Sequence, residues 1–117
     1  MMANNFIQSG DVLPLTAPYD VVAGDGFQVG QIFAVAASAV LSGQPVQGQR
    51  VGVFSLKKAD AQIWGEGALI YWDNSSKNCT TTAAGNLLIG AAAANVGSSA
   101  LTGAVALHAS VRANEAP

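Results

Sequence analysis

Short runs of apolar and β-branched residues alternate with turn-forming residues along this chain. The most informative run is residues 65–73 (GEGALIYWD), which a polar turn and a threonine-rich run follow directly. A strand, a polar turn and a second strand are typical of a β-hairpin. Because side chains alternate along a strand, Tyr71 and Trp72 should point to opposite faces, one into the core and one toward the rim or a neighbouring subunit. We expect this structural hairpin, with Tyr71, Trp72 and Asp73 on its first strand, to organise the fold.

Hydrophobic periodicity predicts further strands on both sides of this hairpin. They are expected over residues 12–16, 21–23, 27–36, 50–56, 87–94 and 101–112. Pro14 has no backbone N–H to donate, so the first of these strands should lie at a sheet edge or contain a bulge. Gly30 predicts a bulge within the strand over residues 27–36.

Three segments between the predicted strands have weaker patterns. Residues 57–64 are the best helix candidate, with about two turns at most. Residues 37–42 are ambiguous, because alanine favours a helix but the segment is short and uncapped. Residues 43–49 are predicted to form a loop or a polar edge segment. Turn signals recur about every 8 to 12 residues, which is the spacing of a small β-barrel or β-sandwich. The sequence therefore predicts a mainly β, single-domain fold with at most one short helix.

The two ends of the chain differ from this predicted body. Residues 1–8 are largely polar, but they carry two adjacent apolar side chains, Phe6 and Ile7. An unanchored terminus is usually poorly ordered, so this apolar pair indicates an arm that docks on another surface. We expect an extended N-terminal arm over residues 1–8, a β-rich domain over residues 9–113 and a polar tail over residues 114–117.

Composition separates this chain from an ordinary soluble domain. Half of its 117 residues are hydrophobic and only 10% are charged, whereas about 25% of residues are charged in a typical domain. A monomer needs charged surface to stay soluble, so we expect partners to cover much of the outside. The net charge is −2 and the five basic residues are scattered. Nucleic acid is therefore not an expected partner, because the basic residues are too scattered to follow a phosphate backbone.

Candidate chemistry is sparse. Cys79 is the single cysteine and His108 the single histidine, which excludes an internal disulfide and a multi-cysteine zinc site. Residues 43–50 copy the glycine frame of a phosphate-binding loop, but Gln-Arg replaces the required Lys-Ser/Thr pair, so no nucleotide site is expected. Four of the seven acidic residues fall in predicted turns, where carboxylates cap the backbone. We expect no enzymatic activity, no metal and no cofactor.

Residues 31–49 and 78–111 are uncharged stretches long enough to span a membrane. Small polar residues and glycines interrupt them every few positions, whereas a spanning helix has about 20 predominantly apolar residues. Short strands fit this pattern better, and no membrane partner is expected. Residues 1–5 lack the positive charge and the following apolar run of a signal peptide, so we expect a protein that is soluble and intracellular where it is made.

Several segments taken together resemble a known family. NNFIQSGD (residues 4–11) precedes LTAP (15–18), and GVFSLKK (52–58) is followed by GALIYWD (67–73) and GNLLIG (85–90). This order and spacing resemble the capsid cement, or decoration, proteins of tailed bacteriophages over nearly the whole chain. Tyr-Trp-Asp followed by Gly-Asn-x-x-Ile-Gly is the most specific part of the resemblance.

The resemblance implies a small, β-rich, non-enzymatic protein that binds the outer surface of a mature capsid. Such proteins are commonly homotrimers at or near three-fold positions, where they clamp neighbouring major capsid subunits. The protein would then be made in the bacterial host cytoplasm and reside on the virion. For this chain we predict the following capsid contacts in the arm: Asn4, Asn5, Phe6, Ile7 and Gln8. A surface with few charges suits burial in such contacts.

A carbohydrate- or receptor-binding module of a phage spike or tail is the alternative interpretation. Exposed rings of Tyr19, Trp64 or Trp72 would then stack on sugars. This alternative requires an open groove with several rings on one face. A small hydrolase is a third possibility, which the single histidine and the missing metal set disfavour.

Overall fold

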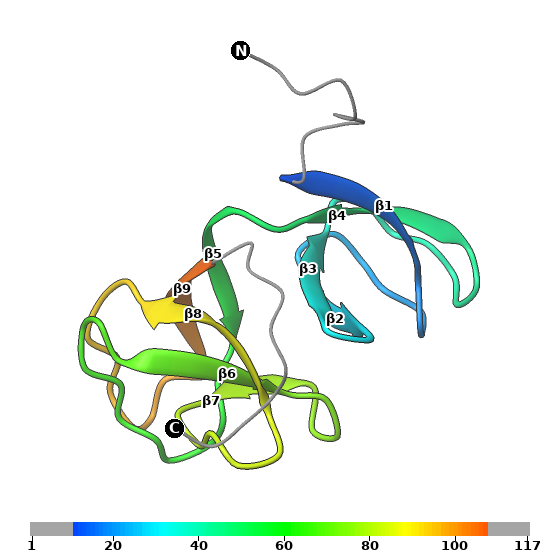
Figure 1. The fold of residues 1–117 in the computed structure, drawn as a ribbon. Coiled ribbons are helices and arrows are strands. Elements are labelled where there is room, and N and C mark those ends of the chain that lie inside the picture. The colour runs from blue at the N-terminus through cyan, green and yellow to red at the C-terminus, as the bar shows by residue number, and fades with distance from the viewer. Residues whose placement is uncertain (1–10, 108–117) are drawn as a thin grey trace.

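The computed structural model describes residues 11–107, and every regular element in that range is a β-strand (Figure 1). In chain order the strands are β1 (Val12–Thr16), β2 (Gly26–Val29), β3 (Ile32–Ala36), β4 (Pro45–Gln49), β5 (Gly52–Lys57), β6 (Leu69–Asp73), β7 (Asn78–Thr80), β8 (Leu87–Ala92) and β9 (Thr102–Leu107). They form two sheets that share a hydrophobic core. The prediction of a mainly β fold is therefore confirmed.

The first sheet has four antiparallel strands in the order β1-β4-β3-β2. Strand β1 pairs with β4 alone in this sheet, and Pro14 lies opposite Gln47 there. An edge strand tolerates proline because one row of its backbone groups faces away from the sheet. The edge position predicted from Pro14 is confirmed.

The second sheet has five antiparallel strands in the order β5-β9-β8-β6-β7 and curls into a half-barrel (Figure 1). Its two edges meet just beyond β5, where Lys58 forms a parallel bridge with Cys79 and the N–H of Ala59 donates to the carbonyl oxygen of Cys79 at 2.8 Å. The register between β6 and β8 shifts between Ile70 and Tyr71. Such an irregularity increases local twist and so helps a sheet to curl.

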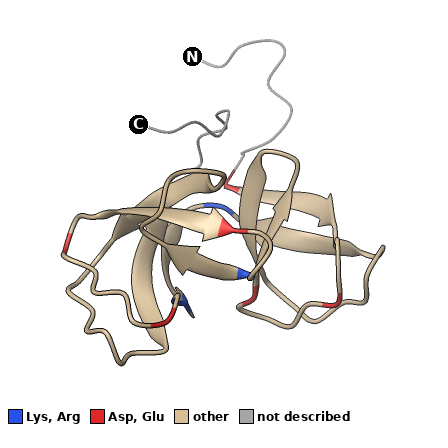
Figure 2. Ribbon diagram, turned by 90° about the horizontal axis from the view of Figure 1, so that it is seen from below, with Lys and Arg blue, Asp and Glu red and all other residues tan. Residues whose placement is uncertain are grey.

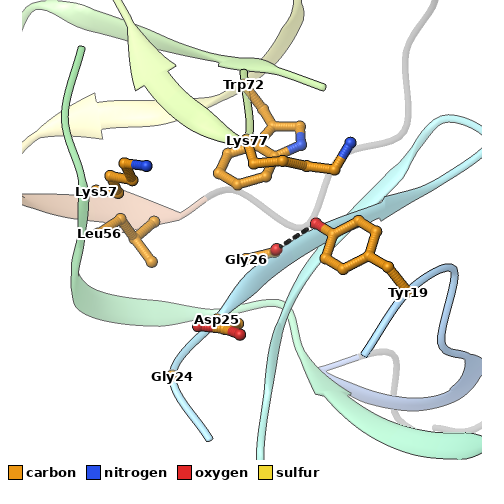
Figure 3. Close-up of a pocket in the computed structure, with 8 residues that line it drawn as sticks. All are labelled: Tyr19, Gly24, Asp25, Gly26, Leu56, Lys57, Trp72 and Lys77. Carbon is orange, nitrogen blue, oxygen red and sulfur yellow. Dashed lines mark hydrogen bonds between the residues drawn. The ribbon is translucent and has the colours of Figure 1, made fainter. Parts of the chain in front are cut away.

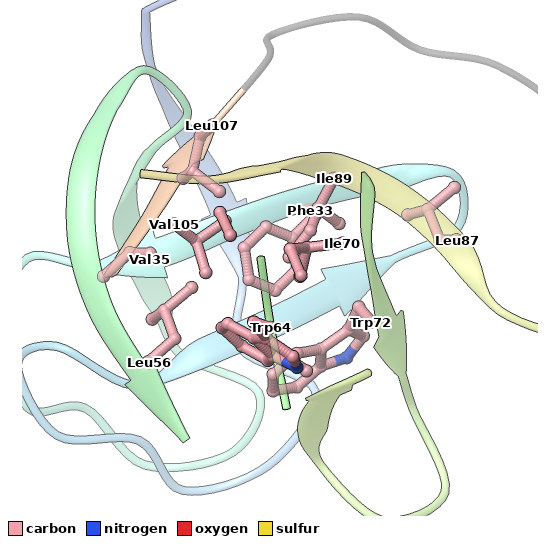
Figure 4. Packing of buried hydrophobic residues seen from close by; sticks show 12 residues of the cluster. Phe33, Val35, Leu56, Trp64, Ile70, Trp72, Leu87, Ile89, Val105 and Leu107 are labelled. Atoms are coloured by element: carbon pink, nitrogen blue, oxygen red, sulfur yellow. The ribbon is translucent and has the colours of Figure 1, made fainter. Parts of the chain in front are cut away.

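One hydrophobic core joins the two sheets. Its larger cluster lies inside the curled sheet and includes Phe33 and Val35 of β3 (Figure 4). The ring centroids of Phe33 and Trp72 are 5.0 Å apart and the ring planes are tilted by 50°, within the range of favourable aromatic pairs. A smaller cluster, which includes Phe27 and Val46, fills the first sheet. The shared cluster makes the two sheets one body.

Two predictions about the first sheet are wrong. Residues 27–36 form a hairpin of β2 and β3 rather than one bulged strand, because Gly30 adopts a φ of 60° and the chain reverses there. Residues 43–49 contain β4, which pairs with both β1 and β3 and so lies inside the sheet. The buried positions of β4 are Val46 and Gly48, and a strand with so little apolar surface is hard to recognise from its sequence.

Two neighbouring segments are less regular than predicted. Residues 21–23, predicted as a strand, and residues 37–42, whose sequence pattern is ambiguous, are joined by an isolated antiparallel bridge between Val21 and Val40. In that bridge each backbone N–H donates to the other residue's carbonyl oxygen at 3.0 Å. The bridge joins the loop between β1 and β2 to the loop between β3 and β4 without extending the first sheet.

The helix predicted over residues 57–64 is also wrong. Ala61 has a φ of 63°, which a right-handed helix does not allow. Bridges from Lys58 to Cys79 and from Trp64 to Val96 tie one end of the segment to β7 and the other to the loop between β8 and β9. Lys58 is 2% exposed and Trp64 is 1% exposed. Burial of these two side chains outweighs the weak local preference for a helix.

Candidate functional site

The turn that follows β6 is held by its own polar groups. Oδ1 of Asp73 accepts hydrogen bonds from the backbone N–H groups of Ser75 at 3.0 Å and Ser76 at 3.2 Å. The N–H of Lys77 donates to the carbonyl oxygen of Asp73 at 2.7 Å, and Lys77 adopts a φ of 59°. Aspartate commonly stabilises turns in this way. The turn therefore determines how Lys77 leaves the hairpin.

Both aromatic residues of β6 are buried. Trp72 is 2% exposed and packs in the larger hydrophobic cluster, and its Nε1 donates to Oδ1 of Asn74 at 3.1 Å. The side chain of Tyr71 points to the opposite face of the sheet from Trp72, yet it is only 5% exposed. The expectation that one of these rings would lie at the rim or face a neighbouring subunit is therefore wrong.

Lys77 borders a cleft at the seam between the two sheets (Figure 3). The cleft has a volume of about 240 Å³ and is lined by Tyr19, Gly24, Asp25, Gly26, Leu56, Lys57, Trp72 and Lys77. The hydroxyl of Tyr19 donates to the carbonyl oxygen of Gly26 at 2.7 Å. Nζ of Lys77 lies 4.9 Å from the centroid of the Tyr19 ring, within cation–π distance. These contacts join the hairpin turn of the second sheet to a loop of the first.

Charged residues are few and widely spaced along the described body (Figure 2). The two exposed basic residues both line this cleft. The basic residues between residues 11 and 107 are Arg50, Lys57, Lys58 and Lys77. Arg50 is 8% exposed and Lys58 is 2% exposed. Lys57 and Lys77 are exposed, and both line the cleft. The sequence did not indicate that these two lysines line one cleft, because Lys57 ends β5 and Lys77 lies in the turn between β6 and β7.

Tyr19 stays neutral beside these lysines. Its burial, reinforced by the negative charge of Asp25, raises its pKa to about 12. Oδ2 of Asp25 accepts a hydrogen bond from the N–H of Val22 at 3.0 Å. The phenol therefore keeps its proton, and its hydrogen bond to Gly26, at alkaline pH values where an ordinary tyrosine ionises.

A second polar cluster holds the loop between β5 and β6. Nζ of the buried Lys58 donates to the carbonyl oxygens of Ala59 at 2.9 Å and Gln62 at 2.6 Å. The side chain of Gln62 donates to Oγ1 of Thr80 at 2.8 Å and accepts from Nε1 of Trp64 at 3.2 Å. These groups satisfy one another, so we assign the cluster a structural role.

The residues that the sequence offered for catalysis or phosphate binding belong to the core or to a strand of the fold. Cys79 is 0% exposed, and burial raises the pKa of its thiol from 9.0 to about 12, so it is a poor nucleophile. Residues 43–50 comprise a turn and strand β4 instead of a phosphate cradle. Within residues 11–107, no group of three or more Cys, His, Asp or Glu side chains could hold a metal ion. In the same range no helix is long and apolar enough to cross a membrane.

The remaining predicted residues fall into two groups. The proposed capsid contacts Asn4, Asn5, Phe6, Ile7 and Gln8 lie outside the described residues, as does His108. The aromatic side chains that would stack on sugars in the alternative interpretation lie within the described residues. Trp64 is 1% exposed and Trp72 is 2% exposed. The ring of Tyr19 lies beneath Lys77. These three rings therefore do not form the open stacking platform that a sugar-binding groove requires.

Comparison with known proteins agrees with the resemblance noted in the sequence. The model of a family described as phage cement protein matches residues 7–107. Searches of curated proteins and of solved structures found no match. The matched range contains both sheets, the hairpin and the cleft between the sheets. The chain therefore belongs to the phage cement protein family, whose members are structural proteins of the phage capsid.

Proposed function

We propose that this protein binds the outer surface of the mature capsid and stabilises the contacts between major capsid subunits, without catalysing a reaction. The observation that carries the proposal is the family match over residues 7–107, which spans the whole described range, residues 11–107. The protein would be made in the cytoplasm of the bacterial host and would reside on the outside of the virion. Its partner would be the major capsid protein.

The surface of the described body supports a role in assembly. Large apolar side chains are exposed on both sheets and on their connecting loops: Val12, Val22, Leu41, Val51, Val53, Ile63, Leu69 and Leu101. Isolated exposed apolar residues are ordinary, but here they accompany a chain with only 10% charged residues. We propose that the protein acts as a homotrimer. A trimer engages several capsid subunits at once, which raises avidity even when each contact is modest.

The N-terminal arm is the proposed anchor on the capsid. Phe6 and Ile7 offer adjacent apolar side chains, and Asn4, Asn5 and Gln8 offer amide groups for hydrogen bonds. Deletion of residues 1–8 should weaken capsid binding but leave the fold intact, because both described hydrophobic clusters are built from residues 15–107. Deletion of residues 114–117 is the matched control. Unchanged binding after deletion of the arm would refute its role as an anchor.

Co-sedimentation with phage heads tests the function itself. The purified protein is mixed with expanded, undecorated heads and, in parallel, with unexpanded proheads. We expect saturable binding to the expanded heads alone, near one trimer per local three-fold position. Absence of binding to both particles would refute the proposed function. Light scattering after gel filtration tests the trimer separately, since a monomeric protein that still binds heads would contradict the trimer alone.

A further inference from the structure

The cleft at the seam between the sheets concentrates positive charge on an otherwise acidic protein. The chain has a net charge of −2, and two of the basic residues in the described range, Arg50 and Lys58, are buried. Lys57 and Lys77 are exposed and both line the cleft. The lining contains one acidic residue, Asp25, so two lysines and one aspartate leave a local charge of +1.

Lys77 is held in position by the protein itself. The turn fixes its backbone, and its Nζ donates to the carbonyl oxygen of Asn74 while lying over the ring of Tyr19. An ammonium group has three donors, so a bond to Asn74 leaves donors for an incoming acceptor. A side chain that is already positioned loses less entropy when a partner binds.

The other polar groups of the lining have partners within the protein. Asp25 accepts from the N–H of Val22, and the hydroxyl of Tyr19 donates to Gly26. Leu56 and Trp72 supply apolar parts of the lining (Figure 3). The two ammonium groups are therefore the features of the cleft best suited to an anionic ligand.

The size of the cleft limits what that ligand can be. Its volume of about 240 Å³ lies below the roughly 300–1,000 Å³ of typical small-molecule sites. A single acidic side chain has a carboxylate that the lysines can attract. Its methylene groups can pack against Leu56 and Trp72. This chemistry is offered by an aspartate or glutamate on a protein loop.

We propose that the cleft receives one carboxylate side chain from a surface loop of the capsid, which Lys77 binds and which the positive charge of Lys57 also attracts. This inference rests on the proposed capsid-binding function and names the chemistry of one contact in it. Lys57 lies at the end of β5 and Lys77 in the turn between β6 and β7, so the contact would hold two parts of the second sheet on one capsid loop. Complementary charges of this kind orient partners and raise association rates.

Head binding by matched variants tests the proposal. The double substitution Lys57→Gln/Lys77→Gln removes both charges, and Lys57→Arg/Lys77→Arg keeps them. Asp60→Asn/Glu66→Gln removes two exposed charges outside the cleft and serves as the control. At low salt we expect the glutamine variant to bind expanded heads on the order of ten-fold more weakly, with little change for the arginine variant and the control. Because salt screens exposed charges, the difference should shrink at about 0.3 M salt.

A second measurement probes the cleft without the capsid. An acetylated and amidated tetraglutamate peptide is titrated into the labelled protein at low salt, and a tetraglutamine peptide is the control. We expect NMR shifts at Lys57, Lys77 and the indole N–H of Trp72 with the glutamate peptide alone. Absence of these shifts would overturn the proposal that the cleft recognises a carboxylate.

The outcomes separate this inference from the function on which it rests. Failure of the unsubstituted protein to bind either particle would overturn the proposed function, and the capsid contact with it. Normal head binding by a folded glutamine variant would overturn the cleft contact alone. Dissociation of the oligomer by that variant, measured by light scattering, would assign the carboxylate to a second copy of this chain and so overturn the capsid as its source.

Discussion

The contact among Gly26, Phe33 and Trp72 should determine whether the two sheets act as one body. Phe33 is 9% exposed, and its ring centroid lies 5.0 Å from that of Trp72. A methyl group added at Gly26 would lie 2.8 Å from Cζ of Phe33 and 3.0 Å from Cζ3 of Trp72. Gly26 is not among the glycines with positive φ. An alanine there would therefore act through the clash and without backbone strain.

These contacts set the expected magnitudes. Phe33→Ala should lower the free energy of unfolding by about 3–5 kcal/mol, the usual cost of truncating a buried phenylalanine. Gly26→Ala should lower it by about 1–3 kcal/mol because it overpacks the seam. In the double variant the space left by the missing ring accommodates the new methyl group. The double variant should therefore be less destabilised than the sum of the single variants, by roughly 1–2 kcal/mol.

Urea unfolding followed by tryptophan fluorescence measures the free energy of unfolding of the unsubstituted protein, the two single variants and the double variant. The signal reports unfolding because Trp64 and Trp72 are both buried in the folded state. Val53→Ala is the control: this residue is 62% exposed, so its truncation should change stability by less than about 0.5 kcal/mol. Two results would refute the reasoning. One is a loss below about 1.5 kcal/mol for Phe33→Ala, and the other is additivity of the two substitutions within about 0.5 kcal/mol.

Two further predictions concern buried groups of the second sheet. Lys58→Met leaves the carbonyl oxygens of Ala59 and Gln62 without their donor, so we expect a loss of about 1–3 kcal/mol in urea unfolding. The exposed Lys57→Met is its control, and equal losses for the two variants would contradict the role of the buried ammonium. The pKa of Cys79 rises from 9.0 to about 12 on folding, so the folded protein keeps a proton that the unfolded chain releases. Stability should therefore be constant with respect to this thiol below about pH 9 and fall as the pH rises toward 12. Tyr19 contributes in the same direction, so the test is a shallower fall for Cys79→Ala; superimposable slopes would show that the thiol is not the cause.

The sequence by itself determined the features that depend on neighbouring residues. Alternating apolar residues and an Asp-Asn-Ser-Ser turn predicted the hairpin of β6 and β7, because strand alternation and turn capping are local properties. Pro14 predicted an edge strand because a missing N–H is a property of one residue. The scattered motif GALIYWD followed by GNLLIG was enough to indicate the family that the comparison then showed.

Only the tertiary structure decided where the chain departs from its local preferences. Residues 57–64 could have formed a helix, but burial of Lys58 and Trp64 against distant strands required an irregular loop. Strand β4 became an inner strand although its sequence is polar, because β1 and β3 supply hydrogen bonds on both sides. Lys57 and Lys77 line one cleft because the second sheet curls and brings the end of β5 near the turn between β6 and β7. Contacts between residues far apart in the chain depend on the whole packing arrangement, and local periodicity does not encode them.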